Sequence, residues 1–356
     1  MPKLSIFTIY EPGITNLRTL KIGIKAIEYI KGLSDVSHEN IIEFLSMVTK
    51  FCNGIVNFEF SNAFLNSFVN IIKLQPLESI LLDIGELQGE NAKKVIHSLE
   101  FRSETLKKLS FYDFNFQGID LSFISKFDCL ERLDLIRVYG IGCYELQNLL
   151  TKEYHFKELK LEIRSNDFIV AMINSFCGQT LQRLSLNNVT PETVKAVRES
   201  CPNIKFLYIN IRSERFLSSI IPPICELSSL RILNVALNIS YHGNYGPIAK
   251  ILGDNLKFVE CLLLYFIIGL PSFKYFTDNC KANLKKLVIC RSNLRKDYLI
   301  HISNYQKVHN SLKLFGIEYG NGLTDEELEI IDLLKNRGID VTLRYEDYCA
   351  SLDEFF

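Results

Sequence analysis

A six-residue pattern recurs along the chain, with apolar residues at its first, fourth and sixth positions. After a longer first gap, successive copies begin about 22 to 29 residues apart, a period typical of structural repeats that stack into a solenoid. Because the fourth and sixth positions alternate with other side chains, each copy predicts a strand with one buried face. The copies begin at Leu17, Ile55, Leu77, Leu106, Leu130, Phe156, Leu181, Ile204 and Leu230, with weaker copies at Leu256, Leu284 and Leu312.

Between the predicted strands, the chain contains segments with helical periodicity. In residues 192–200 two valines share one face, and Thr190 is placed to cap this helix just before Pro191. A single repeat cannot bury its apolar face alone, so neighbouring repeats must stack. The spacing predicts an α/β leucine-rich-repeat solenoid, a horseshoe with parallel strands on the concave face and helices on the convex face. Similar helical segments are 169–176, 248–252 and 273–280.

The two ends of the array depart from the repeat. Near the C-terminus, Thr324 and Glu327 fit a capping box that opens a helix, and Gly338 ends it before a last strand at 339–343. We expect one solenoid domain over residues 1–356, with an atypical N-terminal cap at about 1–54 and a C-terminal cap at about 323–356. The acidic, aromatic tail from Glu346 fits a frayed cap, with a short partner-binding motif as the alternative. The N-terminal cap contains a predicted helix that begins at Ser37 and buries Ile41, Ile42, Leu45, Val48 and Phe51.

The predicted register also determines which side chains face a partner. If the fourth and sixth positions point into the core, the third, fifth and seventh point to the concave surface. The middle repeats then present mixed charge and the later ones apolar and aromatic groups, as in an interface with a polar region and a hydrophobic hot spot. A shifted register in the weaker copies would instead place Phe258 and Leu262 in the core. The candidate partner-binding residues are Arg132, Asp134, Glu158, Lys160, Glu162, Arg183, Asn187, Phe206, Tyr208, Asn210, Ile232, Asn234, Phe258, Leu262 and Val288.

Charge and hydropathy exclude other classes of partner. The formal net charge is −1 and no run of like charges stands out, so we expect neither nucleic-acid nor membrane binding. The longest apolar run, residues 262–270, is about half as long as a membrane-spanning helix and predicts a buried strand and a turn. No signal peptide is recognisable, and the 10 cysteines are spread singly. We therefore expect reduced, buried thiols and a cytoplasmic or nuclear location.

No motif for catalysis or cofactor binding occurs in the sequence. It contains no glycine-rich phosphate loop, dinucleotide fingerprint, nucleophile elbow or zinc-protease motif. The 6 histidines fall in unrelated repeats, without a cysteine or acid at metal-ligand spacing. The acidic residues 325–327 suit a helix N-terminus without any further role. We expect no enzyme activity, no cofactor and no metal.

Two segments carry a more specific pattern. Residues 185–209 contain a Cys201-Pro202-Asn203-Ile204 junction before a strand, and residues 322–331 contain Thr324 and Asp325 in a Thr-Asp-x-x-Leu segment. Both resemble the cysteine-containing class of leucine-rich repeat, which is typical of F-box proteins, the substrate adaptors of SCF-type ubiquitin ligases. The loose repeats, rich in Ile, Phe, Asn and Lys, look like those of large fungal families of such proteins. The resemblance covers the chain from about Leu17 onward and implies a protein substrate held on the concave face.

One part of that family pattern is missing. In F-box proteins a helical module precedes the repeats and docks the linker subunit of the ligase, whereas here the first hexad already begins at Leu17. Residues 33–52 have a faint F-box-like rhythm but lack the usual early proline and late tryptophan. The resemblance therefore implies the SCF linker subunit as a partner only if an F-box lies upstream in a longer gene product. The alternative is a stand-alone leucine-rich-repeat scaffold or regulator, for example of a GTPase.

Overall fold

The computed structural model describes residues 17–22, 34–61, 65–83, 89–141, 154–176, 178–238, 246–290, 296–317 and 323–343. The chain divides into two compact units, Met1–Thr180 and Leu181–Phe356, called unit 1 and unit 2 below. Within each unit, strands and helical connections alternate along the chain. The fold is α/β, as the sequence predicts, whereas the extent of a single domain stays a prediction.

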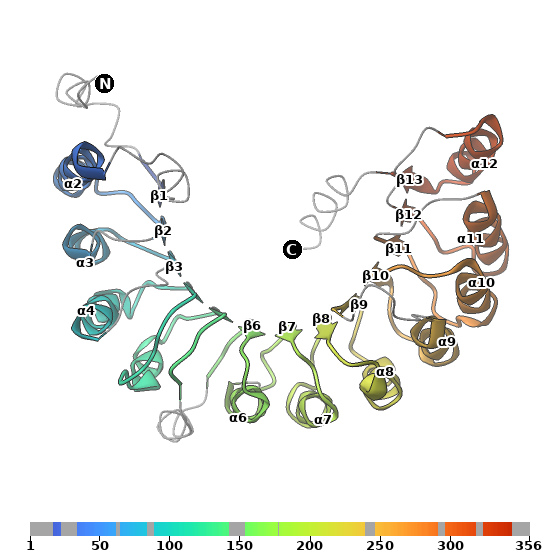
Figure 1. The fold of residues 1–356 in the computed structure, drawn as a ribbon, viewed down its shortest axis with the longest axis horizontal. Coiled ribbons are helices and arrows are strands. Elements are labelled where there is room, and N and C mark those ends of the chain that lie inside the picture. Colours follow the sequence, from blue (N-terminus) through green and yellow to red (C-terminus); the bar gives the residue numbers. More distant parts are fainter. Residues whose placement is uncertain are drawn as a thin grey trace. The chain divides into compact units, whose positions relative to one another are not determined.

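Unit 1 forms a parallel sheet in which each strand pairs with the next one in chain order. Its strands are β1 (Thr19–Ile22), β2 (Asn57–Ser61), β3 (Ser79–Asp83), β4 (Lys108–Tyr112), β5 (Arg132–Ile136) and β6 (Glu158–Glu162). Its described helices are α2 (Ser34–Phe51), α3 (Leu65–Leu74), α4 (Glu90–Leu99), α6 (Asn166–Phe176) and the 3-10 helices η2 (Glu100–Arg102) and η3 (Leu121–Lys126). Figure 1 shows the helices of this unit on one side of its sheet, so the other side is lined by strands alone among the described elements.

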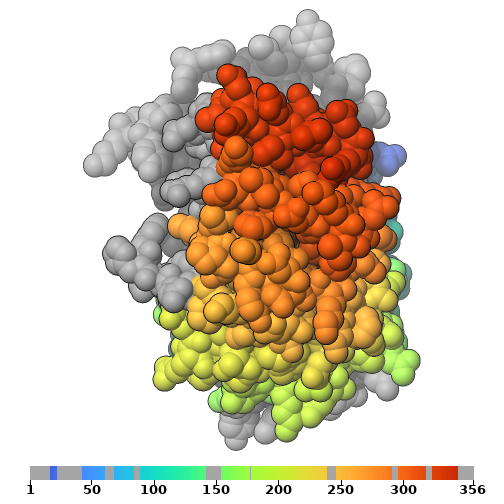
Figure 2. All heavy atoms as spheres, turned by 90° about the vertical axis from the view of Figure 1, so that its right-hand side faces the viewer, coloured from blue at the N-terminus to red at the C-terminus, as the bar shows by residue number. Residues whose placement is uncertain are grey.

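Unit 2 repeats the same arrangement of parallel strands and helical connections. Its parallel strands are β7 (Arg183–Asn187), β8 (Phe206–Ile211), β9 (Ile232–Leu237), β10 (Cys261–Tyr265), β11 (Lys286–Ile289), β12 (Leu314–Ile317) and β13 (Asp340–Thr342). Its helices are α7 (Pro191–Ser200), η5 (Glu214–Phe216), α8 (Leu217–Cys225), α9 (Gly246–Asn255), α10 (Leu270–Asn279), α11 (Lys296–His309) and α12 (Asp325–Asn336). In Figure 2 the repeats of this unit stack in chain order, from yellow through orange to red.

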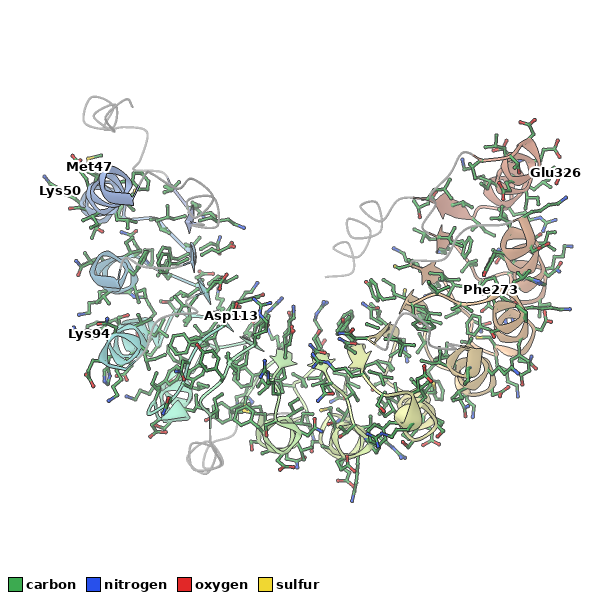
Figure 3. The ribbon with its side chains drawn as sticks, viewed as in Figure 1. Met47, Lys50, Lys94, Asp113, Phe273 and Glu326 are labelled. Carbon is green, nitrogen blue, oxygen red and sulfur yellow. The ribbon has the colours of Figure 1, made fainter. Side chains whose placement is uncertain are left out.

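The core of each repeat lies between the sheet and the helices. The fourth and sixth positions of the hexads, such as Leu133 and Leu135 in β5, are fully buried there. Aromatic rings fill the wider gaps: Phe111 meets Phe114 edge-on at 5.0 Å in unit 1. In unit 2, Phe273 points from α10 toward the strands and is fully buried (Figure 3). The strand residues that alternate with these core positions must therefore face the opposite side of each sheet.

Two helices begin and end as the sequence predicts. The Thr190 side chain accepts a hydrogen bond from the Thr193 backbone N–H, and Pro191 occupies the first turn of α7. Thr324 and Glu327 form the predicted capping box of α12, and Gly338 after that helix has a positive φ of 78°. That conformation costs a glycine little, which explains why the helix stops there.

The N-terminal helix differs from its prediction in two ways. It begins at Ser34 rather than Ser37, and Ile42 is solvent exposed. Leu45 and Val48 are buried, whereas Phe51 is half-buried and the side chain of Ile41 lies outside the described residues. The buried stripe is narrower than predicted because α2 has a helical neighbour, α3, on only one side among the described elements.

Most of the described cysteines are buried thiols, as the sequence predicts. Cys129 is the exception among them, because it lies in an exposed turn just before β5. Cys143, Cys177 and Cys349 lie outside the described residues. The buried free cysteines are Cys52, Cys201, Cys225, Cys261, Cys280 and Cys290.

Candidate interaction surface

The side of each sheet opposite the helices forms a surface that we call the strand face. Its centre is the fifth hexad position of successive strands, which the parallel register places side by side; we call these residues the middle row. In unit 1 the middle row is Lys21, Glu59, Leu81, Ser110, Asp134 and Lys160. In unit 2 it is Ser185, Tyr208, Asn234, Leu263, Val288, Gly316 and Thr342.

The strand face of unit 1 carries a network of charged side chains. Arg132 lies between two carboxylates, with Nε 3.1 Å from Asp134 Oδ1 and Nη1 2.8 Å from Glu158 Oε2. The hydroxyl of Ser110 donates to the other oxygen of Asp134 at 2.8 Å. Asp134 is therefore hydrogen bonded on both oxygens, which explains how a carboxylate remains buried on this face.

The pKa values of the basic groups reflect this network. Burial opposes the charge on Arg132, but the charges and hydrogen bond of Asp134, together with Glu158, outweigh it and raise the Arg132 pKa. For Lys108, beside Arg132 in the register, burial and the neighbouring guanidinium lower the pKa. Lys160 and Glu162 on the next strand are half-buried. The structure thus brings Arg132, Asp134 and Glu158 into one ionic cluster, with Lys160 next to Asp134 in the register.

A second ion pair lies where the strands of unit 1 end. The carboxylate of Asp113, which is marked in Figure 3, accepts two hydrogen bonds from Arg137 at 2.7 and 2.6 Å. This bidentate geometry, with two parallel hydrogen bonds between one guanidinium and one carboxylate, fixes both side chains more firmly than a single hydrogen bond would. Both residues have positive φ, so the same turn shape recurs after β4 and β5. Charged pairs therefore extend from the centre of the unit 1 strand face to its border.

The strand face of unit 2 is mainly apolar. Phe206, Ile232 and Cys261 form one cluster with Tyr208 packed against it. The guanidinium of Arg183 lies 4.7 Å from the centre of the Phe206 ring, close enough for a cation–π contact. A second cluster contains Leu263, Val288, Cys290 and Leu314, with Tyr265 packed against it. The rings of Tyr208 and Tyr265 meet 6.4 Å apart, so they link the two clusters.

Asparagines interrupt this apolar surface. Asn210 Nδ2 donates to Asn187 Oδ1 at 2.8 Å, joining two neighbouring strands. The Oδ1 atoms of Asn210 and Asn234 are buried without a hydrogen-bond partner among the described residues. A buried acceptor without a donor costs free energy, so these two oxygens are sites where a bound donor would be favoured.

The structure corrects the predicted register at β10. Leu262 pairs with the core residues Leu233 and Leu287 and is fully buried, so it cannot contact a partner on the strand face. Phe258 is exposed, but it precedes β10 and lies outside the strand. The strand-face positions belong instead to Cys261, Leu263 and Tyr265, which the sequence did not identify. Alternation is invisible here because four consecutive residues, 261–264, are apolar and buried on both sides of the sheet.

The other candidate residues lie on the strand face as predicted. Val288 follows Leu263 on the middle row, and Ile232 pairs with Phe206 and Cys261. Whether these residues contact a partner stays a prediction.

Among the described residues, no group of three or more His, Cys, Asp or Glu side chains is arranged to hold a metal ion. Burial raises the pKa of the Cys261 thiol to about 11, so it is protonated at neutral pH and a poor nucleophile. In the same part of the chain, none of the helices has the length and apolar character needed to cross a membrane.

Comparison with known proteins gives no relative by sequence. No protein-family model matches the chain, and no curated protein matches it. Solved structures with a similar fold include a chain of the yeast Rad7 and Elc1 complex, 14% identical with a TM-score of 0.47, covering 97% of this chain and 94% of that one. An internalin of Listeria monocytogenes is 15% identical with a TM-score of 0.38, covering 91% and 87%. A protein from Bacteroides fragilis is 12% identical with a TM-score of 0.36, covering 92% and 85%.

Likenesses this distant carry no conclusion about function. The chain's own features are repeated hexads, parallel strands paired in chain order and helical connections on one side of each sheet. By these features the fold is a leucine-rich-repeat solenoid.

Proposed function

We propose that this chain is a protein-binding module that holds its partner on the strand face. The observation that carries the proposal is the row of aromatic and aliphatic side chains across unit 2, bordered by Arg183 and the asparagines. Aromatic residues and arginine in a well-packed patch are the groups that contribute most to protein–protein affinity. The proposed mechanism is positional and needs no catalytic residue or cofactor in this chain.

The two units contribute differently to such binding. Desolvated aromatic groups such as Tyr208 and Tyr265 supply affinity, because burying apolar area drives association. The ionic cluster around Arg132 supplies orientation, because a partner must match the alternating charges of Arg132, Glu158 and Lys160. We therefore expect a partner segment that binds unit 2 to be apolar, and one that binds unit 1 to be polar with mixed charge.

A finer proposal is that the chain is the substrate-recognition part of an SCF-type ubiquitin-ligase adaptor. Its support is the cysteine-containing repeat pattern: Thr190 caps α7, and Cys201 at the end of that helix is fully buried, so the residues that carry the resemblance have structural roles. In this role the strand face would hold a substrate near a ubiquitin-loaded enzyme. The alternative is a stand-alone repeat scaffold or regulator without a ligase.

The binding proposal is tested with matched variants of the whole chain in affinity capture from cells. The strand-face changes are Tyr208→Ser and Lys160→Glu. Their controls on the helical side are Leu333→Ser and Lys195→Glu, at exposed positions of α12 and α7. We expect one or more interactors to be lost by both strand-face variants and kept by both controls. Equal recovery of every interactor with all four variants would contradict a role of the strand face.

The ligase proposal needs a separate experiment. The full-length gene product is mixed with the purified SCF linker subunit and analysed by size-exclusion chromatography. Co-elution supports the adaptor role, whereas separate elution favours the stand-alone scaffold. This result is independent of the capture experiment, because the linker subunit docks outside the strand face in the family that this chain resembles.

A further inference from the structure

The apolar side chains of the unit 2 strand face are shielded from water, although the described helices of this unit lie on the other side of its sheet. Leu263 is 1% and Val288 3% exposed. The tyrosines that link the two clusters can shelter Leu263, since Tyr265 packs against it. Val288 has less cover on one side, because its next neighbour on the middle row is Gly316, which has no side chain. Cys290 and Leu314 pack beside Val288 in the same cluster, but no described helix or strand of this unit lies over this face (Figure 1).

The connectivity of the chain singles out a segment that can supply this cover. The described part of unit 2 ends at Leu343, directly after β13, and β13 pairs with the strand that carries Leu314 and Gly316. Residues 344–356 continue from that edge. Fully extended, they reach about 45 Å, whereas crossing from β13 to β8 takes about 24 Å at the usual strand spacing. The segment is therefore long enough to cross the apolar face.

The composition of this segment matches the surface. It contains Tyr345, Tyr348, Leu352, Phe355 and Phe356, which suit the two apolar clusters. Four acidic residues lie among these side chains, at positions 346, 347, 353 and 354. The cationic side chains of the face, Arg183 and Lys286, lie at its border beside Phe206 and Cys261. Aromatic groups and opposite charges thus occur both in the segment and on the face.

We propose that residues 344–356 bind the apolar strand face of unit 2 and compete there with the protein partner. The inference rests on the proposed function only in its second half, because the partner is proposed for the same face. Binding of the segment protects the face when no partner is present, and a partner must displace it. The affinity for a partner is then reduced by the fraction of chains with the segment bound.

The chain's own cysteines report on this contact. Cys261 and Cys290 belong to the two apolar clusters of the strand face, whereas Cys225 and Cys280 are buried on the helical side of the same unit. Full-length wild type and the double variant Phe355→Ser/Phe356→Ser are treated with iodoacetamide, and mass spectrometry gives the alkylation rate of each thiol. We expect the rates of Cys261 and Cys290 to rise by about tenfold or more in the variant, since burial of a single phenylalanine corresponds to at least that factor in an equilibrium. The rates of Cys225 and Cys280 stay unchanged.

Two controls complete the experiment. Ser351→Ala removes no apolar group from the segment and leaves all four rates at the wild-type values. A synthetic peptide of residues 344–356, added to the double variant, restores the protection of Cys261 and Cys290. Unchanged rates in the double variant overturn the proposal, and so does an equal rise at all four cysteines, which would show loss of the repeat core. No partner is needed in this assay, so its failure leaves the proposed function untouched.

Discussion

The middle rows of the two strand faces use the same backbone position for opposite chemistry. Asp134 in unit 1 and Asn234 in unit 2 both occupy the fifth hexad position, and both are almost fully buried, at 2% and 4% exposed. Asp134 is bonded to Arg132 and Ser110, whereas the Oδ1 of Asn234 has no partner among the described residues. Burial alone therefore does not determine what a polar residue contributes on this face; the neighbours on the adjacent strands do.

The same stacking of repeats builds a charged network in unit 1 and an apolar cluster in unit 2. In unit 1, the partners of Asp134 come from its own strand and from β4, so a charged network is built by stacking repeats. In unit 2, Leu263 and Val288 come together by the same stacking and make an apolar cluster. In a solenoid, the residue types at one hexad position of successive repeats thus form an extended surface, because each repeat contacts its neighbours.

The largest expected effect tests the register on which the comparison depends. Leu262→Ala should lower the free energy of unfolding by about 2 to 5 kcal/mol, because it leaves a cavity in the core. Leu263→Ala should lower the free energy of unfolding less, because the Leu263 side chain lies in the single layer of side chains on the strand face. The Leu262 side chain lies between the sheet and the helices. Urea denaturation of both variants provides the measurement. A greater loss for Leu263→Ala than for Leu262→Ala would reverse the assignment of the two leucines.

The next effect concerns the charged network of unit 1. Asp134→Leu should lower the free energy of unfolding by about 1 to 3 kcal/mol, because Arg132 and Ser110 lose a buried acceptor. Urea denaturation measures the loss, and Arg132→Met in a double-mutant cycle isolates the pair. Additive losses in the cycle would show that the two side chains do not interact.

The matching change in unit 2 should act in the opposite direction. Asn234→Leu replaces a buried acceptor without a described partner by an apolar side chain of similar size. We expect stability to be unchanged or raised by up to about 1 kcal/mol, because the cost of the unpaired oxygen disappears. Thermal unfolding monitored by circular dichroism is sufficient. A loss as large as that of Asp134→Leu would mean that Asn234 is as well paired as Asp134.

The smallest effect serves as a reference for charge outside the strand face. Lys107 Nζ lies 2.9 Å from Glu78 Oε2, and both side chains are about half exposed. Lys107→Ala should change the free energy of unfolding by less than about 0.5 kcal/mol, because exposed ion pairs contribute little. If urea denaturation gives a loss comparable to that of Asp134→Leu, then burial on the strand face is not what strengthens the unit 1 network.

Most of the fold follows from the sequence because the hexad combines strand alternation with a repeat period. At Arg132, Lys160 and Tyr208 the alternation is regular, and the structure places these side chains on the strand face as predicted. At β10 both Leu256 and Val259 are acceptable starts for a hexad, and both give spacings within the normal range for this repeat. The sequence pattern thus failed at the place where both faces of the strand are apolar.

The character of the candidate surface was only partly predictable. The change from charged to apolar positions is visible in the sequence, but the pairing of Asp134 with Ser110 is not. That pairing depends on the register between two strands separated by a full repeat. The same holds for the contact between Tyr208 and Tyr265, whose rings meet from strands that are not adjacent. Position along the strand predicts which way a side chain points, and only the stacked repeats determine what it touches.

The contrast between a charged strand face in unit 1 and an apolar one in unit 2 is tested most directly by salt. The measurement is how the change in unfolding free energy caused by Asp134→Leu and by Asn234→Leu depends on salt concentration. Unfolding free energies of wild type and both variants are measured by urea denaturation at about 0.05 M and about 1 M NaCl, where the screening length falls to about 3 Å. We predict that the penalty of Asp134→Leu shrinks at high salt, because Arg132 and Glu158 are partly open to solvent, while the effect of Asn234→Leu does not change. Equal salt dependence of the two effects would contradict the division of the strand face into a charged and an apolar part.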